Sequence, residues 1–184
     1  MNWWKALGII LLIYVVVFTF TVPLGPGLVS SGQSSASPGE HEFTVSGYNT
    51  HFSDPSIQVI LSPEKGQYIS CELIKTDDLN LIATANIPTQ LTSKSLDIFV
   101  NNDIDGTMLL ENGLFCESCT VDESSVLPET VINVNNQESK GFHVPYQPLI
   151  FETIRNLMLH VPMWFAMFFL TGMSVIQAVR YLST

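Results

Sequence analysis

Basic residues are scarce in this sequence, and their scarcity excludes a nucleic-acid-binding protein. The 184 residues include 7 Lys and Arg against 17 Asp and Glu, which gives a formal net charge of -10. A surface that binds nucleic-acid phosphates needs clustered Lys and Arg. Acidic residues are in turn absent from both ends, since none precedes Glu40 and none follows Glu152. The chain therefore has two apolar ends around an acidic middle, within a length typical of about one domain.

Cysteine is also scarce, which limits the metal and redox chemistry open to the chain. Cys116 and Cys119 form a C-x-x-C pair, but covalent haem attachment would need histidine where Thr120 stands. A zinc site would normally need a second ligand pair, and only Cys71 remains. We interpret Cys116 and Cys119 as a local disulfide or two plain thiols, with an outward dithiol oxidoreductase as the alternative. Cys71 lies in a strand pattern and is predicted to be a small core residue.

The first apolar end predicts a membrane helix. Residues 6–22 carry no charge, and with the two preceding tryptophans they give about 20 residues, enough to cross a bilayer core of roughly 30 Å. The alternative is a cleaved signal peptide, whose apolar region is normally about 7–15 residues long and precedes a small-residue cleavage site. Ser35-Ala36 resembles such a site, but the apolar run is longer than expected. We predict a retained transmembrane helix over residues 1–23.

The second apolar end predicts another membrane helix and fixes the orientation. Residues 161–179 are uncharged, so we predict a span over residues 161–182. Lys5 flanks the start of the first span and Arg180 flanks the end of the second. The positive-inside rule then predicts that both termini are cytoplasmic and that residues 24–160 lie outside.

The middle segment predicts an all-β domain. Residues 24–40 are rich in Gly, Ser and Pro, which indicates a linker or an opening strand. Several of the following runs alternate apolar and polar residues at roughly 8–12-residue spacing, which predicts a β-sandwich over residues 41–147. The predicted strands are residues 43–46, 57–61, 68–74, 79–85, 96–100, 107–110 and 130–134.

Part of this segment has a more specific pattern. Ser37-Pro38-Gly39-Glu40 leads into FTVSGYN from Phe43 to Asn49, and the strand IFVNN follows from Ile98. Up to about residue 115 the pattern resembles the IPT/TIG immunoglobulin-like module. The resemblance implies a partner-binding or spacer domain, because this fold alone implies no chemistry. The expected fold class is an α-helical membrane protein with two transmembrane helices and an inserted all-β immunoglobulin-like sandwich.

Two weaker features in the middle segment favour structural roles. Residues 101–106 (NNDIDG) partly match the start of a calcium loop, but the bidentate Glu required at the twelfth position is replaced by Asn112. Asp105-Gly106 between two apolar runs instead predicts a hairpin turn. His41 and His51 have no cluster of ligands near them in the sequence, so we interpret them as solvated or hydrogen-bonded residues.

The segment before the second span carries the most informative residues. Residues 148–160 (PLIFETIRNLMLH) predict a short amphipathic helix at the outer membrane surface. Pro162 then either limits the helix or begins the next one. His160 therefore falls at the outer lip of the span, as an ordinary interfacial residue or as a metal or haem ligand.

The run ETIRNLMLHVPMWFAM, from Glu152 to Met167, closely resembles the ETIRNLYFHVPMWF stretch of the CcmC/CcsA cytochrome c biogenesis family, also called haem exporter protein C. The resemblance covers residues 1–23 and 148–182. It implies that His160 is an axial ligand of haem b, and that the chain is a non-enzymatic factor of cytochrome c maturation in the bacterial inner membrane. The implied partners are a periplasmic haem chaperone, other maturation membrane proteins and the lipid bilayer.

The neighbours of His160 gain roles from the same resemblance. Arg155 becomes a partner for a haem propionate, because guanidinium pairs well with carboxylates, although an intrahelical pair with Glu152 is the alternative. Trp164 and Phe165 pack against the macrocycle or face lipid.

The chain also departs from that family. The family has about six spans, a tryptophan-rich outer loop and a second outer histidine ligand, and none of these is visible in this sequence. We therefore expect the N-terminal part of a longer protein with an incomplete haem site. His143-Val144-Pro145 repeats the letters of His160-Val161-Pro162, which makes His143 a weak second-ligand candidate. The alternative function is a membrane-anchored immunoglobulin-like binding module with no haem role.

Overall fold

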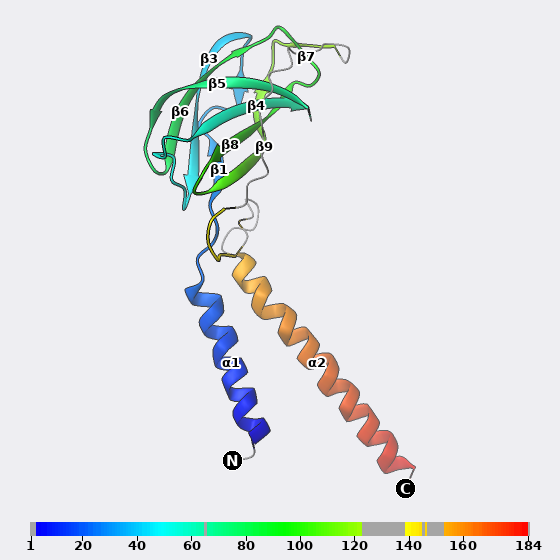
Figure 1. Cartoon of the computed structure of the whole chain (residues 1–184). Helices are drawn as coiled ribbons and strands as arrows, with labels where there is room; N and C mark the ends of the chain where they lie inside the picture. Colours follow the sequence, from blue (N-terminus) through cyan, green and yellow to red (C-terminus); the bar gives the residue numbers. More distant parts are fainter. Residues whose placement is uncertain (1–2, 65, 123–138, 145, 147–152, 184) are drawn as a thin grey trace. The chain divides into compact units, whose positions relative to one another are not determined.

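The computed structural model describes residues 3–64, 66–122, 139–144, 146 and 153–183. The chain divides into two compact units. One is the β-rich segment Leu24–Pro148, and the other combines Met1–Pro23 with Leu149–Thr184 (Figure 1).

The β unit is an immunoglobulin-like sandwich, as its strand order shows. Eight strands are hydrogen-bonded in the order β1-β3-β6-β5-β4-β8-β9-β2, and β7 pairs separately with β10. When the two-residue strands β2 and β7 are left out, the other strands from β1 to β9 can be lettered A to G in chain order. The strand order then contains the A-B-E-D and C-F-G sheets of an immunoglobulin domain. The two sheets join where β5 pairs first with β4 and then with β6. The strands are β1 (Gly27–Ser31), β2 (Ser35–Ala36), β3 (Gly39–Tyr48), β4 (Gln58–Glu64), β5 (Gln67–Thr76), β6 (Asn80–Ile87), β7 (Gln90–Leu91), β8 (Ser95–Asn102), β9 (Gly106–Cys116) and β10 (Thr120–Val121).

The core of the sandwich follows from alternation along the strands. In β6 and β8 every second residue is buried, because successive side chains of a strand point to opposite faces. Burial of these apolar faces removes their side chains from water and stabilises the domain. The largest buried side chains are Phe43, Phe52, Leu28, Leu61, Leu81, Ile87, Leu91, Leu96, Ile98 and Leu114.

Residues 24–40 belong to the sandwich, and the expectation of a linker before residue 41 is wrong. β1 pairs antiparallel with β3 from Gly27 opposite Tyr48 to Ser31 opposite Val45. Leu28 of β1 is buried in the core. The Gly- and Ser-rich composition gives this strand little alternation of apolar and polar residues, because few of its side chains face inward. The opening-strand alternative therefore describes the segment correctly.

The other strand predictions agree well with the structure. The first six predicted runs after residue 40 overlap β3, β4, β5, β6, β8 and β9. The seventh, residues 130–134, lies outside the described residues.

The second unit contains two helices, α1 (Trp3–Thr21) and α2 (Thr153–Leu182). Within α2, Leu159–Leu182 is 24 residues long and apolar enough to cross a membrane. The apolar part of α1, Lys5–Thr21, is shorter than the roughly 20 residues that a span needs. Among the described residues, one helix therefore meets the length of a membrane span where two were expected.

α2 is continuous where the sequence predicted a boundary. The expected amphipathic helix (residues 148–160) and the expected span (residues 161–182) form one 30-residue element from Thr153 onward, with Pro162 inside it. Proline removes one amide donor from the helix, but the hydrogen bonds of the other turns remain. His160 thus lies within a regular helix, one residue after the start of the apolar stretch.

Candidate functional site

The face of α2 that carries His160 forms an apolar hollow of about 600 Å³. Its lining residues recur at three- and four-residue spacing, so they share one side of the helix. The rings of Trp164 and Phe168 lie 6.3 Å apart between centroids, with their planes inclined by 57°. The lining residues are Leu157, His160, Val161, Trp164, Phe165 and Phe168.

The hollow combines one imidazole with an apolar, aromatic wall. Neutral imidazole is a good axial ligand for haem iron, and an apolar, aromatic wall suits the macrocycle. His160 is exposed, and within the part of the chain that the structure describes it makes no hydrogen bond that would occupy its ring nitrogens. It is the one histidine in the sequence of this unit.

The structure brings Trp164 to the same hollow as His160. Arg155 lies on α2 five residues before His160, but its side chain lies outside the described part of the structure. Glu152 is likewise outside the described residues. Both roles predicted for Arg155, with a propionate or with Glu152, therefore stay predictions.

The C-x-x-C pair is a disulfide in the structure. Cys116 and Cys119 are bonded, with their Cα atoms 5.5 Å apart, and both residues are buried. The bond closes the turn between β9 and β10 and so places β10 beside β7. A dithiol oxidoreductase needs an accessible thiolate, so the burial of both sulfur atoms favours a structural bond.

Cys71 is the remaining cysteine and is partly buried on β5. Burial raises the pKa of its thiol to about 12, which a backbone hydrogen bond with Leu61 only partly offsets. The thiol is therefore protonated at neutral pH and is a poor nucleophile.

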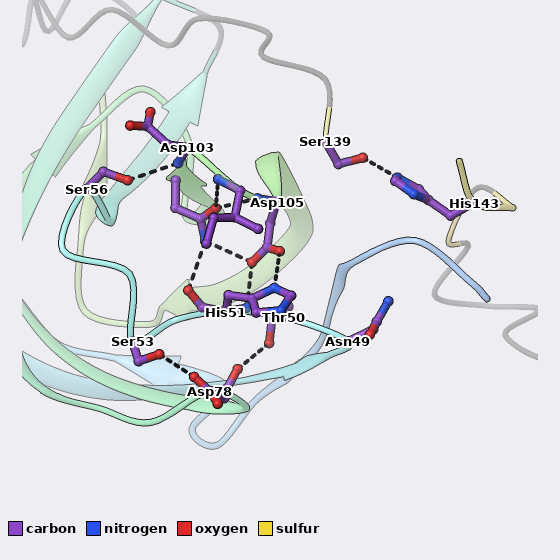
Figure 2. A network of polar contacts seen from close by, with 12 residues as sticks. Asn49, Thr50, His51, Ser53, Ser56, Asp78, Asp103, Asp105, Ser139 and His143 are labelled. Carbon is purple, nitrogen blue, oxygen red and sulfur yellow. Dashed lines mark hydrogen bonds and ion pairs between the residues drawn. The ribbon is translucent and has the colours of Figure 1, made fainter. Parts of the chain in front are cut away.

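A polar cluster that the sequence did not predict lies at one end of the sandwich (Figure 2). The Asp105 side chain is only 2% exposed. Its carboxylate accepts hydrogen bonds from the His51 amide at 2.6 Å, from His51 Nδ1 at 2.8 Å and from Asn102 Nδ2 at 2.8 Å. His51 and Asp105 are 54 residues apart, so no local pattern could have paired them.

This cluster decides between the calcium loop and the turn. The Asn102 side-chain oxygen accepts hydrogen bonds from the amides of Ile104 and Asp105, as expected for a side-chain-stabilised turn. The oxygens of Asp105 are already occupied by protein donors, so the predicted turn is confirmed. His51 is hydrogen-bonded as interpreted, whereas His41 differs, because its buried Nε2 has no partner among the described residues.

The first and last described segments of the sandwich unit meet at a neck. We define the neck as residues 24–27 together with residues 139–144 and 146. Leu24 and Val144 form a parallel β-bridge and are 1% and 2% exposed. The Gly25 amide donates to the Val144 carbonyl at 2.8 Å, and the Asn49 side chain donates to the Leu24 carbonyl at 2.9 Å. The first and last described segments of this unit therefore run side by side and in the same direction at the neck.

Two glycines allow the close packing of the neck. A Cβ atom on Gly25 would lie 2.7 Å from the His143 ring, and one on Gly27 would lie 2.0 Å from the Tyr146 ring. Tyr146 also stacks on Tyr48, with ring centroids 6.0 Å apart and planes inclined by 20°. The aromatic rings of the outgoing segment thus lie directly on the backbone of the incoming segment.

Comparison with known proteins adds little beyond the fold. No family model matches the chain, and no curated protein matches it. Among solved structures the chain is similar to one described as the crystal structure of the Lin-41 filamin domain, with 10% identity, over 56% of this chain and 100% of that chain, at a TM-score of 0.28. That likeness is too weak to carry an argument, so the immunoglobulin-like fold rests on the strand order. The class defined by the structure is an immunoglobulin-like sandwich with an apolar helix long enough to span a membrane.

Proposed function

We propose that this chain presents haem at the outer face of the bacterial inner membrane, as the N-terminal part of a CcmC/CcsA-type protein of cytochrome c maturation. The observation that carries the proposal is the position of His160. It stands in the run from Glu152 to Met167 that resembles this family, and it lies at the start of the apolar stretch, beside an aromatic hollow. The receiving partner would be a periplasmic haem chaperone.

The proposed chemistry is binding and release. Haem, as the cargo, would take the imidazole of His160 as an axial ligand and pack on Trp164 and Phe165. Arg155 would pair with a propionate.

The disulfide supports an outer location for the sandwich. Disulfides persist in the periplasm and other oxidising compartments and are rare in the cytosol. A buried Cys116–Cys119 bond therefore fits a domain that matures outside the cytoplasm. The positive-inside rule, with Lys5 and Arg180, supports the same orientation.

The neck supports a retained α1. Cleavage after Ala36 would remove β1 and leave the core without Leu28. It would also remove Leu24, the buried partner of Val144. We propose that the retained α1 is a second, shorter membrane helix and that both termini are cytoplasmic.

Haem binding by the full chain in detergent tests the proposal. We expect haem to give a red-shifted Soret band with the wild type, and His160→Ala to weaken binding at least tenfold. His51→Ala is the matched control, because its side chain is 52% exposed but lies on the sandwich. Unchanged haem affinity in His160→Ala would overturn the assigned role of His160.

The second candidate function is a membrane-anchored immunoglobulin-like binding module without haem. The fold itself favours it, since such sandwiches commonly bind partners. The two functions separate in cells. A maturation factor should be required for cytochrome c assembly through His160, whereas a binding module should tolerate His160→Ala.

A further inference from the structure

An exposed apolar patch lies at the neck end of the sandwich. Phe142 is 76% exposed, and Ile104 and Leu109 are 40% and 41% exposed. Phe142 and Leu109 line the same groove of about 660 Å³. Ile104 adjoins them, because its carbonyl accepts a hydrogen bond of 3.0 Å from the amide of Lys140, two residues before Phe142. Large apolar side chains that gather on a surface often mark a binding face.

The groove at this patch offers little to a metal ion or a charged ligand. His143 lines it, but its ring packs against Gly25 and its Nε2 atom is hydrogen-bonded to the Ser139 hydroxyl (Figure 2). Asp105 lines it too, but its carboxylate is already hydrogen-bonded within the polar cluster described above. The patch is therefore suited to an apolar partner.

The neck differs in charge from the rest of its unit. Its residues, 24–27, 139–144 and 146, contain one base, Lys140, and no acid, whereas the rest of the unit is strongly acidic. Asp103 on the adjoining turn is exposed. A carboxylate keeps its water in the headgroup region of a bilayer and loses it in the hydrocarbon core, at a large cost in free energy. The patch therefore fits the interface of a bilayer better than its interior.

The connection to α1 indicates which apolar partner is nearest. Leu24, the first residue of the neck, follows Thr21, the last residue of α1, with two residues between them. Such a connection spans at most about 11 Å. With α1 retained in the membrane, as proposed above, the neck begins within that reach of the end of a membrane helix. The nearest apolar partner for the patch is then the bilayer.

We propose that the neck patch, which we define as Ile104, Leu109 and Phe142, docks on the outer surface of the lipid bilayer, with the Phe142 ring inserted among the headgroups. Phenylalanine and leucine side chains of interfacial segments lie about 5–10 Å deep at this boundary. The proposal rests on the membrane location given in the proposed function and not on haem. Docking would fix the orientation of the sandwich on the membrane.

Quenchers carried by the lipid test this contact. The full chain with Cys71→Ala and Phe142→Cys is labelled with a nitrobenzoxadiazole fluorophore, while Cys116 and Cys119 stay in their disulfide. It is reconstituted in phosphatidylcholine vesicles that contain lipids with a nitroxide near the headgroup. We expect this label to be quenched several-fold more than the same label at Phe115→Cys.

Phe115 is the matched control for Phe142. It is a 47% exposed phenylalanine of the same domain. It lies six residues beyond Leu109 on β9, which places it roughly 20 Å along the strand from the patch. A label at this position therefore reports whether the lipid contact is confined to the neck end.

A second set of variants keeps the label apart from the residue under test. With the label at Leu109→Cys, adding Phe142→Ser should lower quenching by the headgroup nitroxide several-fold, because the inserted ring is lost. Adding Phe115→Ser should leave the quenching unchanged. Both phenylalanines are exposed, so neither substitution should shift the thermal unfolding midpoint of the sandwich.

The outcomes separate docking from anchoring. Equal quenching of the labels at Phe142→Cys and Phe115→Cys overturns the docking proposal, and so does a label at Phe142→Cys that stays in water. If the chain nevertheless remains in the vesicles after alkaline carbonate extraction, its anchoring stands. Release of the chain by carbonate overturns the membrane location together with the docking. The haem titration of His160→Ala is independent of these readouts, so a failed haem role leaves the docking result unchanged.

Discussion

The backbone amide of Gly25 donates a hydrogen bond of 2.8 Å to the carbonyl of Val144, which lies 119 positions further along the chain. It connects the first residues of the sandwich unit to the last described segment of the same unit. The adjacent Leu24–Val144 bridge is buried, so the contact is part of the domain's packing. The first and last described segments of the sandwich unit are thereby held together at the neck.

Charge at this bridge should open the neck. Val144→Asp places a carboxylate at a buried position without a partner, and we expect a loss of about 2–4 kcal/mol in the free energy of unfolding. Denaturant unfolding of the full chain in detergent measures it. Phe142→Asp, at an exposed neighbouring position, should cost far less. Equal losses would show that the bridge contributes nothing specific.

Removal of the Asp105 carboxylate should destabilise the same end of the sandwich. Asp105→Ala leaves the His51 amide and ring and the Asn102 amide without their acceptor. We expect a loss of about 2–4 kcal/mol in the free energy of unfolding. Asp103→Ala is the control, because Asp103 is exposed and contributes its backbone amide to Ser56. Millimolar Ca²⁺ should not shift the unfolding midpoint of the wild type, since the turn is already satisfied by protein groups.

Thiol chemistry should distinguish the three cysteines. In denaturant without reductant we expect one alkylatable thiol, from Cys71, and three after reduction. In the folded protein at pH 8, alkylation of Cys71 should be at least tenfold slower than in denaturant, because its pKa is raised to about 12. Mass spectrometry after iodoacetamide treatment measures both. Three reactive thiols before reduction would contradict the disulfide.

Acid should weaken the turn between β5 and β6. The Leu79 and Asn80 amides donate to the Asp77 carboxylate, which lowers the pKa of Asp77 below 3.8 in the folded protein. The folded state therefore binds fewer protons, so this contribution to stability is present above about pH 4 and is lost as pH falls through the folded pKa. The free energy of unfolding can be measured between about pH 2.5 and 7, a range that spans the ordinary pKa of an aspartate. Asp77→Asn should lose less stability than the wild type as the pH falls.

Asp103→Asn is the control for this experiment, because its side chain accepts no hydrogen bond among the described residues. It should retain the wild-type loss of stability in acid. If Asp77→Asn also retains the full loss, the hydrogen bonds to Asp77 do not contribute to the pH dependence.

Local periodicity explains why most strands could be predicted. In β6 and β8 every second residue is buried along the whole strand, so their sequences carry the strand signal themselves. β1 lacks that signal, because its membership depends on Leu28 reaching the core and on pairing with β3. For this reason the composition of residues 24–40 indicated a linker, although the segment contains the edge strand β1.

The continuity of α2 was also not predictable from local rules. Proline is a frequent helix boundary, so a break near Pro162 was the reasonable expectation. The structure instead carries the helix through Pro162, which puts the polar residues before it and the apolar residues after it on one axis. His160 and Trp164 consequently share one helix face.

The sequence by itself determined the division into apolar ends and an acidic β middle, because charge distribution and strand alternation are local properties. The residues around His160 also made it the candidate ligand, which stays a prediction. Only the tertiary structure decided the pairing of Leu24 with Val144, the burial of Asp105 beside His51, and the placement of His143 in a groove. Each of these joins residues far apart along the chain, and such contacts depend on how the two sheets close around their shared core.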